Sequence, residues 1–253
     1  MKTMPTLIDC VPEKYFKTCA IVGAGGKSTI LYHLAEQLSS QGSNVLVTTT
    51  TRIFNPVFEG RANVDLWVGT PESVVPSENC LIKVAGIKEE EGHKKLVGYT
   101  SEQVMLIASS NRFDNILIEA DGAKRKPIKA PADNEPVIPE NVSLVIGVIG
   151  LDALGRELNE PNVHRVKEFL EVTGLTEGEL ISEKVCASLI CSSQGLFKNA
   201  PSKAAKLLVF NKADTSVRID QGRKTASLLE KYDGVKPDYI AITSFKTGRF
   251  LSL

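Results

Sequence analysis

The stretch CAIVGAGGKSTILYHLAEQL, residues 19–38, decides the fold of this chain. A short apolar run leads into three glycines within four positions, and a lysine and two hydroxyl residues follow directly. From Lys27 onward, apolar residues recur with helical spacing until Gly42, which is a typical helix stop. The stretch therefore predicts a buried strand over 18–22, a glycine-rich loop, and a helix over 27–42.

The rest of the chain repeats this alternation. Further strands are predicted at 44–49, 63–69, 80–85, 115–120 and 143–150, within 205–214, and at 238–243. Helices are predicted at 101–110, 162–174, 176–195 and 219–232. Apolar strands that alternate with helices are typical of parallel sheets. The predicted fold class is therefore α/β: a doubly wound, mostly parallel sheet in a single P-loop NTPase-like domain over 1–253. An insertion with short strands at about 63–100 is expected to hold a β-hairpin that includes residues 80–88.

Composition and charge exclude several classes of function. Lys and Arg number 30 and Asp and Glu also number 30, so no global positive field favours nucleic acid or a membrane surface. No apolar run approaches the roughly 18 residues of a membrane span, and the first residues do not resemble a signal peptide. The five cysteines form no C-x-x-C pair, which favours buried free thiols. We expect a cytoplasmic protein with no membrane or nucleic-acid partner.

The glycine loop predicts a phosphate site. Backbone N–H groups in such a loop and the positive end of the next helix both favour an anion. Lys27 would reach the terminal phosphates of a nucleotide, and Ser28 would place its hydroxyl on Mg²⁺. The full pattern G-x-x-x-x-G-K-[ST] fails because Ile21 stands at its first glycine, but a shorter G-x-x-G-K-S fits. The alternative is an ordinary strand-to-helix turn. The predicted phosphate-binding residues are Gly23, Ala24, Gly25, Gly26, Lys27, Ser28 and Thr29.

Two carboxylates end the apolar strand of ILIEADGAKRK, namely Glu119 and Asp121. A charge at the tip of a buried strand is costly unless it is paired or bound to metal. A strand-end carboxylate is also what a Mg²⁺–nucleotide complex needs, and Gly122 would let the backbone approach the γ-phosphate. The alternative is a polar strand end that faces solvent. Which carboxylate holds the metal, directly or through water, stays open.

The segment LLVFNKADT predicts a base-binding site. Asp214 can accept hydrogen bonds from guanine N1–H and the 2-amino group, Asn211 can reach the other edge, and the Lys212 stem can cover the ring. Adenine would leave the carboxylate unpaired, at a cost of about 1–3 kcal/mol. The expected cofactors are thus Mg²⁺ and GTP, with ATP as the alternative nucleotide. An ordinary loop would also explain the four residues.

The strand end VTTTTR carries four threonines and Arg52. A threonine there, Thr50, could complete the Mg²⁺ shell, and Arg52 could meet phosphate charge. Lys27, Glu119, Asp121 and Arg52 are therefore the candidate catalytic residues, and Ser28, Thr50, Glu119 and Asp121 are the candidate metal ligands. The alternative is that β-branched residues simply suit a strand.

Basic residues follow the acidic pair at Lys124, Arg125, Lys126 and Lys129, and a His164–Arg165 pair comes later. Such runs are usually solvated surface. Beside a phosphate site, they could bind an anionic second substrate instead.

These motifs together resemble the YqeC family, described as selenium-dependent molybdenum hydroxylase accessory proteins. The resemblance covers nearly the whole chain and rests on VGAGGKST, VLVTTTT, ILIEADGAKRKPIKAPADNEPVIP, VIGLDALGREL, VHR and NKAD. It implies a role in maturing a selenium-containing molybdenum cofactor or in inserting it. The implied partner is a molybdenum hydroxylase or its cofactor.

The order of motifs also looks like that of the nickel-insertion GTPases, whose E-x-x-G matches Glu119 and Gly122. The shortened loop and the lack of a His- or Cys-rich segment argue against nickel handling. The short loop is similar to that of Mur-type peptide ligases, so an ATP-dependent ligase- or kinase-like enzyme is the alternative. A nucleotide-gated chaperone with negligible turnover is another. The favoured prediction is a Mg²⁺-dependent hydrolase that prefers GTP.

Overall fold

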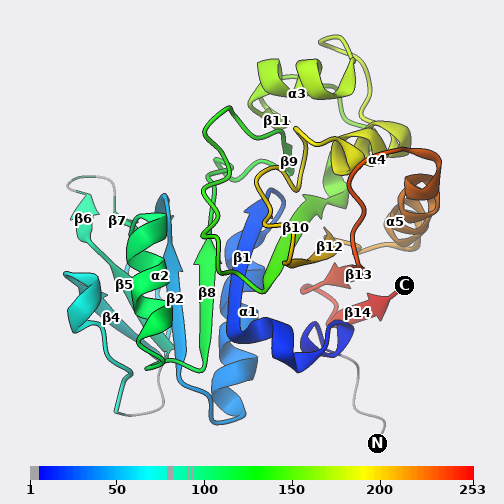
Figure 1. The fold of residues 1–253 in the computed structure, drawn as a ribbon. Helices are drawn as coiled ribbons and strands as arrows, with labels where there is room; N and C mark the ends of the chain where they lie inside the picture. Colours follow the sequence, from blue (N-terminus) through cyan, green and yellow to red (C-terminus); the bar gives the residue numbers. More distant parts are fainter. Residues whose placement is uncertain (1–5, 79–81, 91, 93) are drawn as a thin grey trace, which may run out of the picture.

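The computed structural model describes residues 6–78, 82–90, 92 and 94–253. Within these residues, nine strands form one sheet in the order β14-β13-β12-β10-β1-β8-β2-β5-β4 (Figure 1). Neighbouring strands run parallel, except that β14 is antiparallel to β13. The strands are β1 Thr18–Gly23, β2 Val45–Thr49, β4 Val64–Val68, β5 Ile82–Gly86, β8 Asn115–Glu119, β10 Leu144–Gly150, β12 Ala205–Asn211, β13 Tyr239–Ser244 and β14 Arg249–Ser252. The predicted α/β class with a mostly parallel sheet is confirmed.

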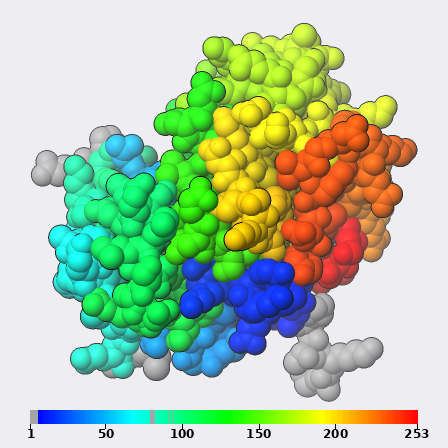
Figure 2. Space-filling view, viewed as in Figure 1, coloured from blue at the N-terminus to red at the C-terminus, as the bar shows by residue number. Residues whose placement is uncertain are grey.

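Helices cover both faces of the sheet. The helix α1 (Lys27–Ser40) packs on one face with the short 3₁₀ segments Ile8–Cys10 and Glu13–Lys17. The other face is covered by α2 Ser101–Ser109, α4 Glu183–Cys191 and α5 Ser216–Leu228, and α3 Val166–Thr173 packs against α4. Side chains of β1 alternate between the two cores, because successive residues of a strand point to opposite faces. Figure 2 shows the region of α3 as a rounded projection above the rest of the molecule.

The strand order brings the predicted site residues to one edge. The strand β1 lies between β8 and β10, although the chain passes through α1 and β2 before it reaches either. Ligands of open parallel sheets bind outside the carboxyl ends of the strands at such a change of direction. The loops after β1, β8, β10 and β12 therefore all open at this edge.

The predicted insertion is smaller than expected. The strands β4 and β5, placed in the insertion by sequence, extend the main sheet, because β5 pairs in parallel with β2 and β4 pairs in parallel with β5. A separate antiparallel sheet contains β3 Arg52–Phe54, β6 Lys88–Glu90 and β7 Lys95–Val97. The hairpin is thus formed by β6 and β7, so the expectation that it includes residues 80–88 holds for Lys88, whereas residues 82–86 belong to β5 of the main sheet. Residues 80 and 81 lie outside the described residues.

Other boundaries also differ from the predictions. Residues 163–164 form β11, which pairs with β9 (Ile128–Lys129), so α3 begins later than expected. The helices α4 and α5 begin where the hydroxyls of Ser182 and Thr215 cap them, not where their apolar patterns begin. The cysteines at 10, 19, 186 and 191 are buried free thiols, as predicted, whereas Cys80 and His93 lie outside the described residues. No helix in the described part of the chain is long and apolar enough to span a membrane.

Candidate functional site

The glycine loop between β1 and α1 packs tightly against neighbouring backbone. Gly25 has a φ of 90°, and a side chain there would place its Cβ 2.2 Å from the backbone nitrogen of Gly150. Gly26 has a φ of 122°, and a Cβ there would lie 2.4 Å from the side-chain amide of Asn211. Both positions require glycine, because a side chain would be strained and would clash.

Several N–H groups of the loop are already paired. The N–H groups of Gly23, Ala24 and Gly25 donate to the Asp121 side chain and to the carbonyls of Val148 and Lys126. This differs from the expectation that the whole loop exposes its donors, and it follows from the close packing of the short loop. Among the described residues, the N–H groups from Lys27 to Thr29 have no carbonyl partner. Such free donors at a helix start attract anions.

Lys27 lies at the centre of this edge and is 4% exposed. Its ammonium donates to the carbonyl of Gly23 at 2.7 Å and lies 3.1 Å from Asp121 Oδ1. Burial alone would lower the pKa of Lys27, but the carboxylates of Asp121 and Glu119 outweigh it and raise the pKa above its usual value. A fixed positive charge therefore stands beside the free N–H groups of α1.

Glu119 ends β8 directly beside the start of α1. The hydroxyl of Ser28 donates to Glu119 Oε2 at 2.9 Å, and Glu119 as a residue is 7% exposed. Burial raises the pKa of Glu119, whereas Lys27 and the Ser28 hydroxyl oppose that shift. The hydroxyl and the carboxylate are oxygen ligands of the kind that Mg²⁺ prefers.

Asp121 begins a chain of buried ion pairs. Besides Lys27, it contacts Lys129 at 3.0 Å, and Lys129 contacts Glu135 at 2.7 Å. Glu135 in turn contacts Arg165 at 3.0 Å. Burial would raise the pKa of Glu135, but Lys129 and Arg165 hold it below its usual value. Asp121 is therefore paired with two protein cations, although its Oδ1 accepts no hydrogen bond from the described residues, whereas Glu119 accepts only a hydroxyl among the described side chains.

The predicted His164–Arg165 pair lies next to this chain. Burial and the positive charges of Lys129 and Arg165 lower the pKa of His164 to about 4. His164 is consequently neutral at pH 7. Of the predicted basic run, Lys129 is buried, whereas Lys124 and Arg125 are exposed.

We expect His164 to make the folded state sensitive to mild acid. Between pH 6.5 and about 4, the unfolded chain binds a proton at this residue and the folded chain does not. The stability of the wild type should therefore fall as the pH drops through this range, and it should fall less for His164→Gln. Urea denaturation of both proteins at pH 7 and pH 5 measures the difference. An equal loss of stability in the two proteins would show that His164 does not titrate in this way.

The residues of NKAD lie beside the glycine loop. Asn211 donates to the carbonyl of Gly25 at 2.9 Å and accepts from the hydroxyl of Thr243 at 3.1 Å. The hydroxyl of Ser244 donates to Asp214 Oδ1 at 2.6 Å. Asn211 and Asp214 are thus each held by one of two hydroxyl residues at the end of β13.

Two further charged groups frame these residues. Arg218 of α5 lies 3.4 Å from Asp214 Oδ2. Lys212, which has a left-handed φ of 63°, pairs with Asp152 at 2.8 Å. The second oxygen of Asp214 therefore meets only a long contact, which a ligand could replace.

This chain is similar in sequence to known proteins. The profile of the family described as "YqeC protein" matches residues 19–167. The chain belongs to the YqeC family. A relative from Escherichia coli (strain K12), which bears the name "Uncharacterized protein YqeC", is 33% identical over 210 residues. The alignment covers 81% of this chain and 80% of the relative. No solved structure matches the chain.

The YqeC profile spans only part of the candidate site. It covers the glycine loop, Glu119, Asp121 and the His164–Arg165 pair, and it ends before Asn211. The profile match therefore includes the glycine loop and both strand-end carboxylates but not Asn211 or Asp214.

The remaining predicted residues lie at the end of β2. Thr50 donates to the carbonyl of Val137 at 2.6 Å, so its hydroxyl already has an acceptor. Arg52 is 58% exposed and pairs with Glu90 of β6 at 3.0 Å. The backbone N–H of Thr50 also donates to the carbonyl of Glu119 at 3.2 Å, but the side chains of Thr50 and Arg52 pair with Val137 and Glu90 rather than with Ser28 or the Glu119 carboxylate. Their roles stay predictions. No group of three or more His, Cys, Asp or Glu side chains suited to a metal ion occurs in the described part of this YqeC-family chain.

Sequence reasoning did not find Thr243 and Ser244, which hold Asn211 and Asp214. The available signal was a pair of hydroxyl residues directly after the apolar strand YIAI, because polar residues at other strand ends mark the same edge. Glu135 and Asp152 were missed as well. Each lies in a loop where sequence gives no sign of its ionic partner.

Proposed function

We infer that this YqeC-family chain binds a nucleoside triphosphate with Mg²⁺, prefers GTP to ATP, and hydrolyses it. The observation that carries the proposal is the 2.9 Å hydrogen bond from Asn211 to the carbonyl of Gly25. This hydrogen bond brings a residue predicted to contact the base into direct contact with the loop predicted to bind the phosphates, which supports one shared site.

The phosphate half would use two kinds of hydrogen-bond donor together with a metal ion. The N–H groups at the start of α1 and the Lys27 ammonium would hold the β- and γ-phosphates. Ser28 and Glu119 would anchor Mg²⁺, since a hydroxyl and a carboxylate are oxygen ligands that this ion prefers. Bound Mg²⁺ supplies charge neutralisation at the transferring phosphate. Asp121 would orient Lys27 rather than bind the metal, since it already pairs with two lysines.

The base half would recognise guanine through Asp214. Ser244 fixes one carboxylate oxygen at 2.6 Å and so orients the group. The other oxygen, 3.4 Å from Arg218, would accept from the base. Adenine offers no matching pair of donors, so the half-buried carboxylate would lack a partner in the base.

The biological role that we propose follows the resemblance of the motifs. Nucleotide turnover would serve the maturation of a selenium-dependent molybdenum hydroxylase in the cytoplasm, with that enzyme or its cofactor as partner. The partner would complete the site or trigger turnover, as small nucleotide hydrolases commonly require.

Phosphate release tests the proposed reaction. We expect the purified chain with Mg²⁺ to release phosphate from GTP faster than from ATP, and Lys27→Ala to remove the activity. Single-turnover conditions reveal slow hydrolysis that steady-state measurement would miss. Equal, Lys27-independent release from both nucleotides would contradict the proposal.

Glu119→Gln should separate nucleotide binding from its dependence on Mg²⁺. The amide keeps the hydrogen bond from Ser28 but loses the charge that attracts the ion. We expect GTP affinity without Mg²⁺ to change little and the gain on adding Mg²⁺ to fall by about tenfold, since a charged contact contributes about 1.5–3 kcal/mol. Titration with and without Mg²⁺ measures this gain, and Asp121→Asn serves as the matched control. If Asp121→Asn alone abolishes the gain, Asp121 is the metal anchor.

A further inference from the structure

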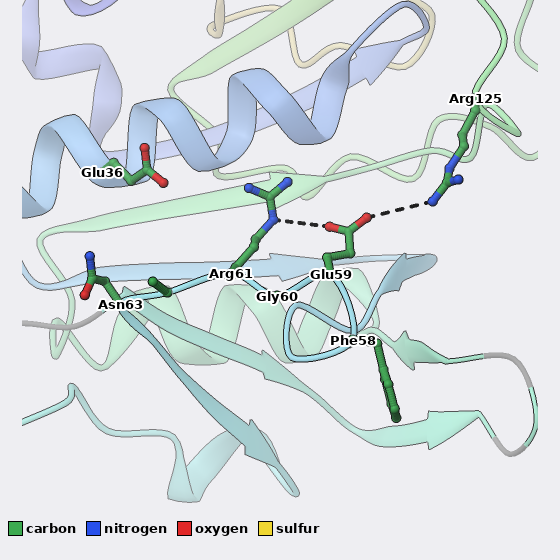
Figure 3. Close-up of a pocket in the computed structure, with 8 residues that line it drawn as sticks. Glu36, Phe58, Glu59, Gly60, Arg61, Asn63 and Arg125 are labelled. Atoms are coloured by element: carbon green, nitrogen blue, oxygen red, sulfur yellow. Dashed lines mark hydrogen bonds and ion pairs between the residues drawn. The ribbon is translucent and has the colours of Figure 1, made fainter.

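A polar pocket lies beside α1, outside the residues assigned to the nucleotide (Figure 3). Its volume is about 660 Å³, and its walls come from α1, from residues 58–63 and from the loop after Asp121. Four charged side chains line it, namely Glu36, Glu59, Arg61 and Arg125. The proposed nucleotide site uses none of these four groups.

Two guanidinium groups of the pocket meet at one carboxylate. Arg61 Nε lies 3.2 Å from Glu59 Oε2, and Arg125 Nη2 lies 4.0 Å from Glu59 Oε1. Figure 3 shows both contacts from the same carboxyl group. Two cations thus share one anion, and the contact with Arg125 is at the outer limit of an ion pair. An added anion could pair with both arginines.

Aromatic rings orient the two arginines before a ligand arrives. Arg61 lies 3.7 Å from the centre of the Tyr32 ring, and Arg125 lies 4.4 Å from that of Phe54. A guanidinium stacked on a ring keeps the N–H donors at its edge available to a carboxylate or phosphate. The buried hydroxyl of Tyr32 also has no hydrogen-bond partner among the described residues, which is uncommon for a buried donor.

The pocket begins near the proposed Mg²⁺ site. Ser28, Tyr32 and Glu36 are four residues apart, so they share one face of α1 at steps of about 6 Å. Figure 3 places Arg125 toward the N-terminal end of α1 and Glu36 farther along it. The pKa of Glu119, raised mainly by burial, is raised further by Glu59. An anion held by the arginines would lie within one or two helix turns of Ser28.

We propose that this pocket binds a small organic anion, a phosphate or a carboxylate, which replaces Glu59 as the partner of Arg61 and Arg125. Glu36 and Asn63 line the opposite end of the pocket (Figure 3). They suit an amine or hydroxyl at the other end of the ligand, because a carboxylate and an amide oxygen both accept hydrogen bonds. The bound molecule would serve as a second substrate, and this role rests on the proposed nucleotide function. Its binding to the pocket does not depend on that function.

Calorimetric titration of the nucleotide-free protein with four probes tests the proposal. Phosphoethanolamine and β-alanine carry both an anion and an amine, whereas inorganic phosphate and acetate carry the anion alone. We expect the amine-bearing probes to bind more tightly, Arg61→Ala to weaken binding by about tenfold or more, and Glu36→Gln to reduce the preference for an amine. Comparison of the phosphates with the carboxylates shows which anion the pocket takes.

Matched variants distinguish binding in this pocket from binding elsewhere on the protein. Arg223→Ala removes an exposed arginine of α5 and should bind the probes as the wild type does. Arg125→Ala, at an exposed side chain, repeats the test if thermal unfolding shows that Arg61→Ala is not folded. Lys27→Ala should no longer bind the triphosphate but should still bind the probes. The anion proposal can therefore hold even if the nucleotide proposal fails.

Three results would contradict the proposal that this pocket binds an anion. These are no binding of any probe, equal binding to the wild type and to both arginine variants, or loss of the probes in Lys27→Ala alone. The last result would place the anion in the glycine loop.

Discussion

Replacing Lys27 by alanine should lower the affinity of the chain for GTP and for ATP by about 10- to 150-fold. A hydrogen bond from a charged donor contributes about 1.5–3 kcal/mol, which corresponds to a change of that size. The Lys27 ammonium is the buried cation at the start of α1, beside the free N–H groups of the helix. Equilibrium titration of wild type and variant with each triphosphate in Mg²⁺ measures the effect.

The variant should remain folded, because Asp121 keeps two of its partners. Lys129 lies 3.0 Å from it, and the N–H of Gly23 donates at 3.1 Å. The loss of stability should therefore be smaller than the roughly 3–5 kcal/mol seen when a buried pair is broken outright. Lys129→Ala is the matched control, since it also removes a lysine from Asp121. If it weakens triphosphate binding as much as Lys27→Ala does, Lys27 acts only through Asp121.

Replacing Asp214 by asparagine should change which nucleotide binds. GTP affinity should fall by the roughly 1–3 kcal/mol of an unmet buried polar group, or about 5- to 150-fold. Affinity for xanthosine triphosphate should rise, because its 2-oxo group accepts from the new amide. ATP affinity should change little, since ATP does not use this carboxylate. Titration of wild type and variant with the three nucleotides measures the shift.

Two further variants show whether the effect belongs to the base. Ser244→Ala removes the hydroxyl that orients Asp214, so it should weaken GTP binding without a gain for the xanthine nucleotide. Asp220→Asn changes an exposed carboxylate on α5 and should have no effect. Equal small changes for all three nucleotides in Asp214→Asn would make NKAD an ordinary loop.

Local sequence was sufficient to predict the elements that position the site. The glycines, Lys27 and the helical pattern are contiguous, and Glu119 directly ends an apolar run. Both signals depend on residues that are close together in the chain. The same holds for the main strands, because strands buried on both faces are continuous apolar runs.

Contacts between distant residues could not be predicted. Asn211 and Gly25, which form a hydrogen bond, are 186 positions apart. The sequence around Lys129 likewise does not indicate that this lysine pairs with both Asp121 and Glu135. The paired N–H groups of the glycine loop result from packing against the segments before Pro127 and after Val148. The strand β14 was missed because RFLS is short and pairs only at the sheet edge, where apolar patterning is weak.

The most direct test of nucleotide recognition is an equilibrium titration of the purified wild-type chain with GTP and with ATP in the presence of Mg²⁺. The account predicts saturable binding of both, with GTP tighter by about 5- to 150-fold, in line with about 1–3 kcal/mol for the carboxylate of Asp214. Absence of binding by either nucleotide, or tighter binding of ATP than of GTP, would contradict it.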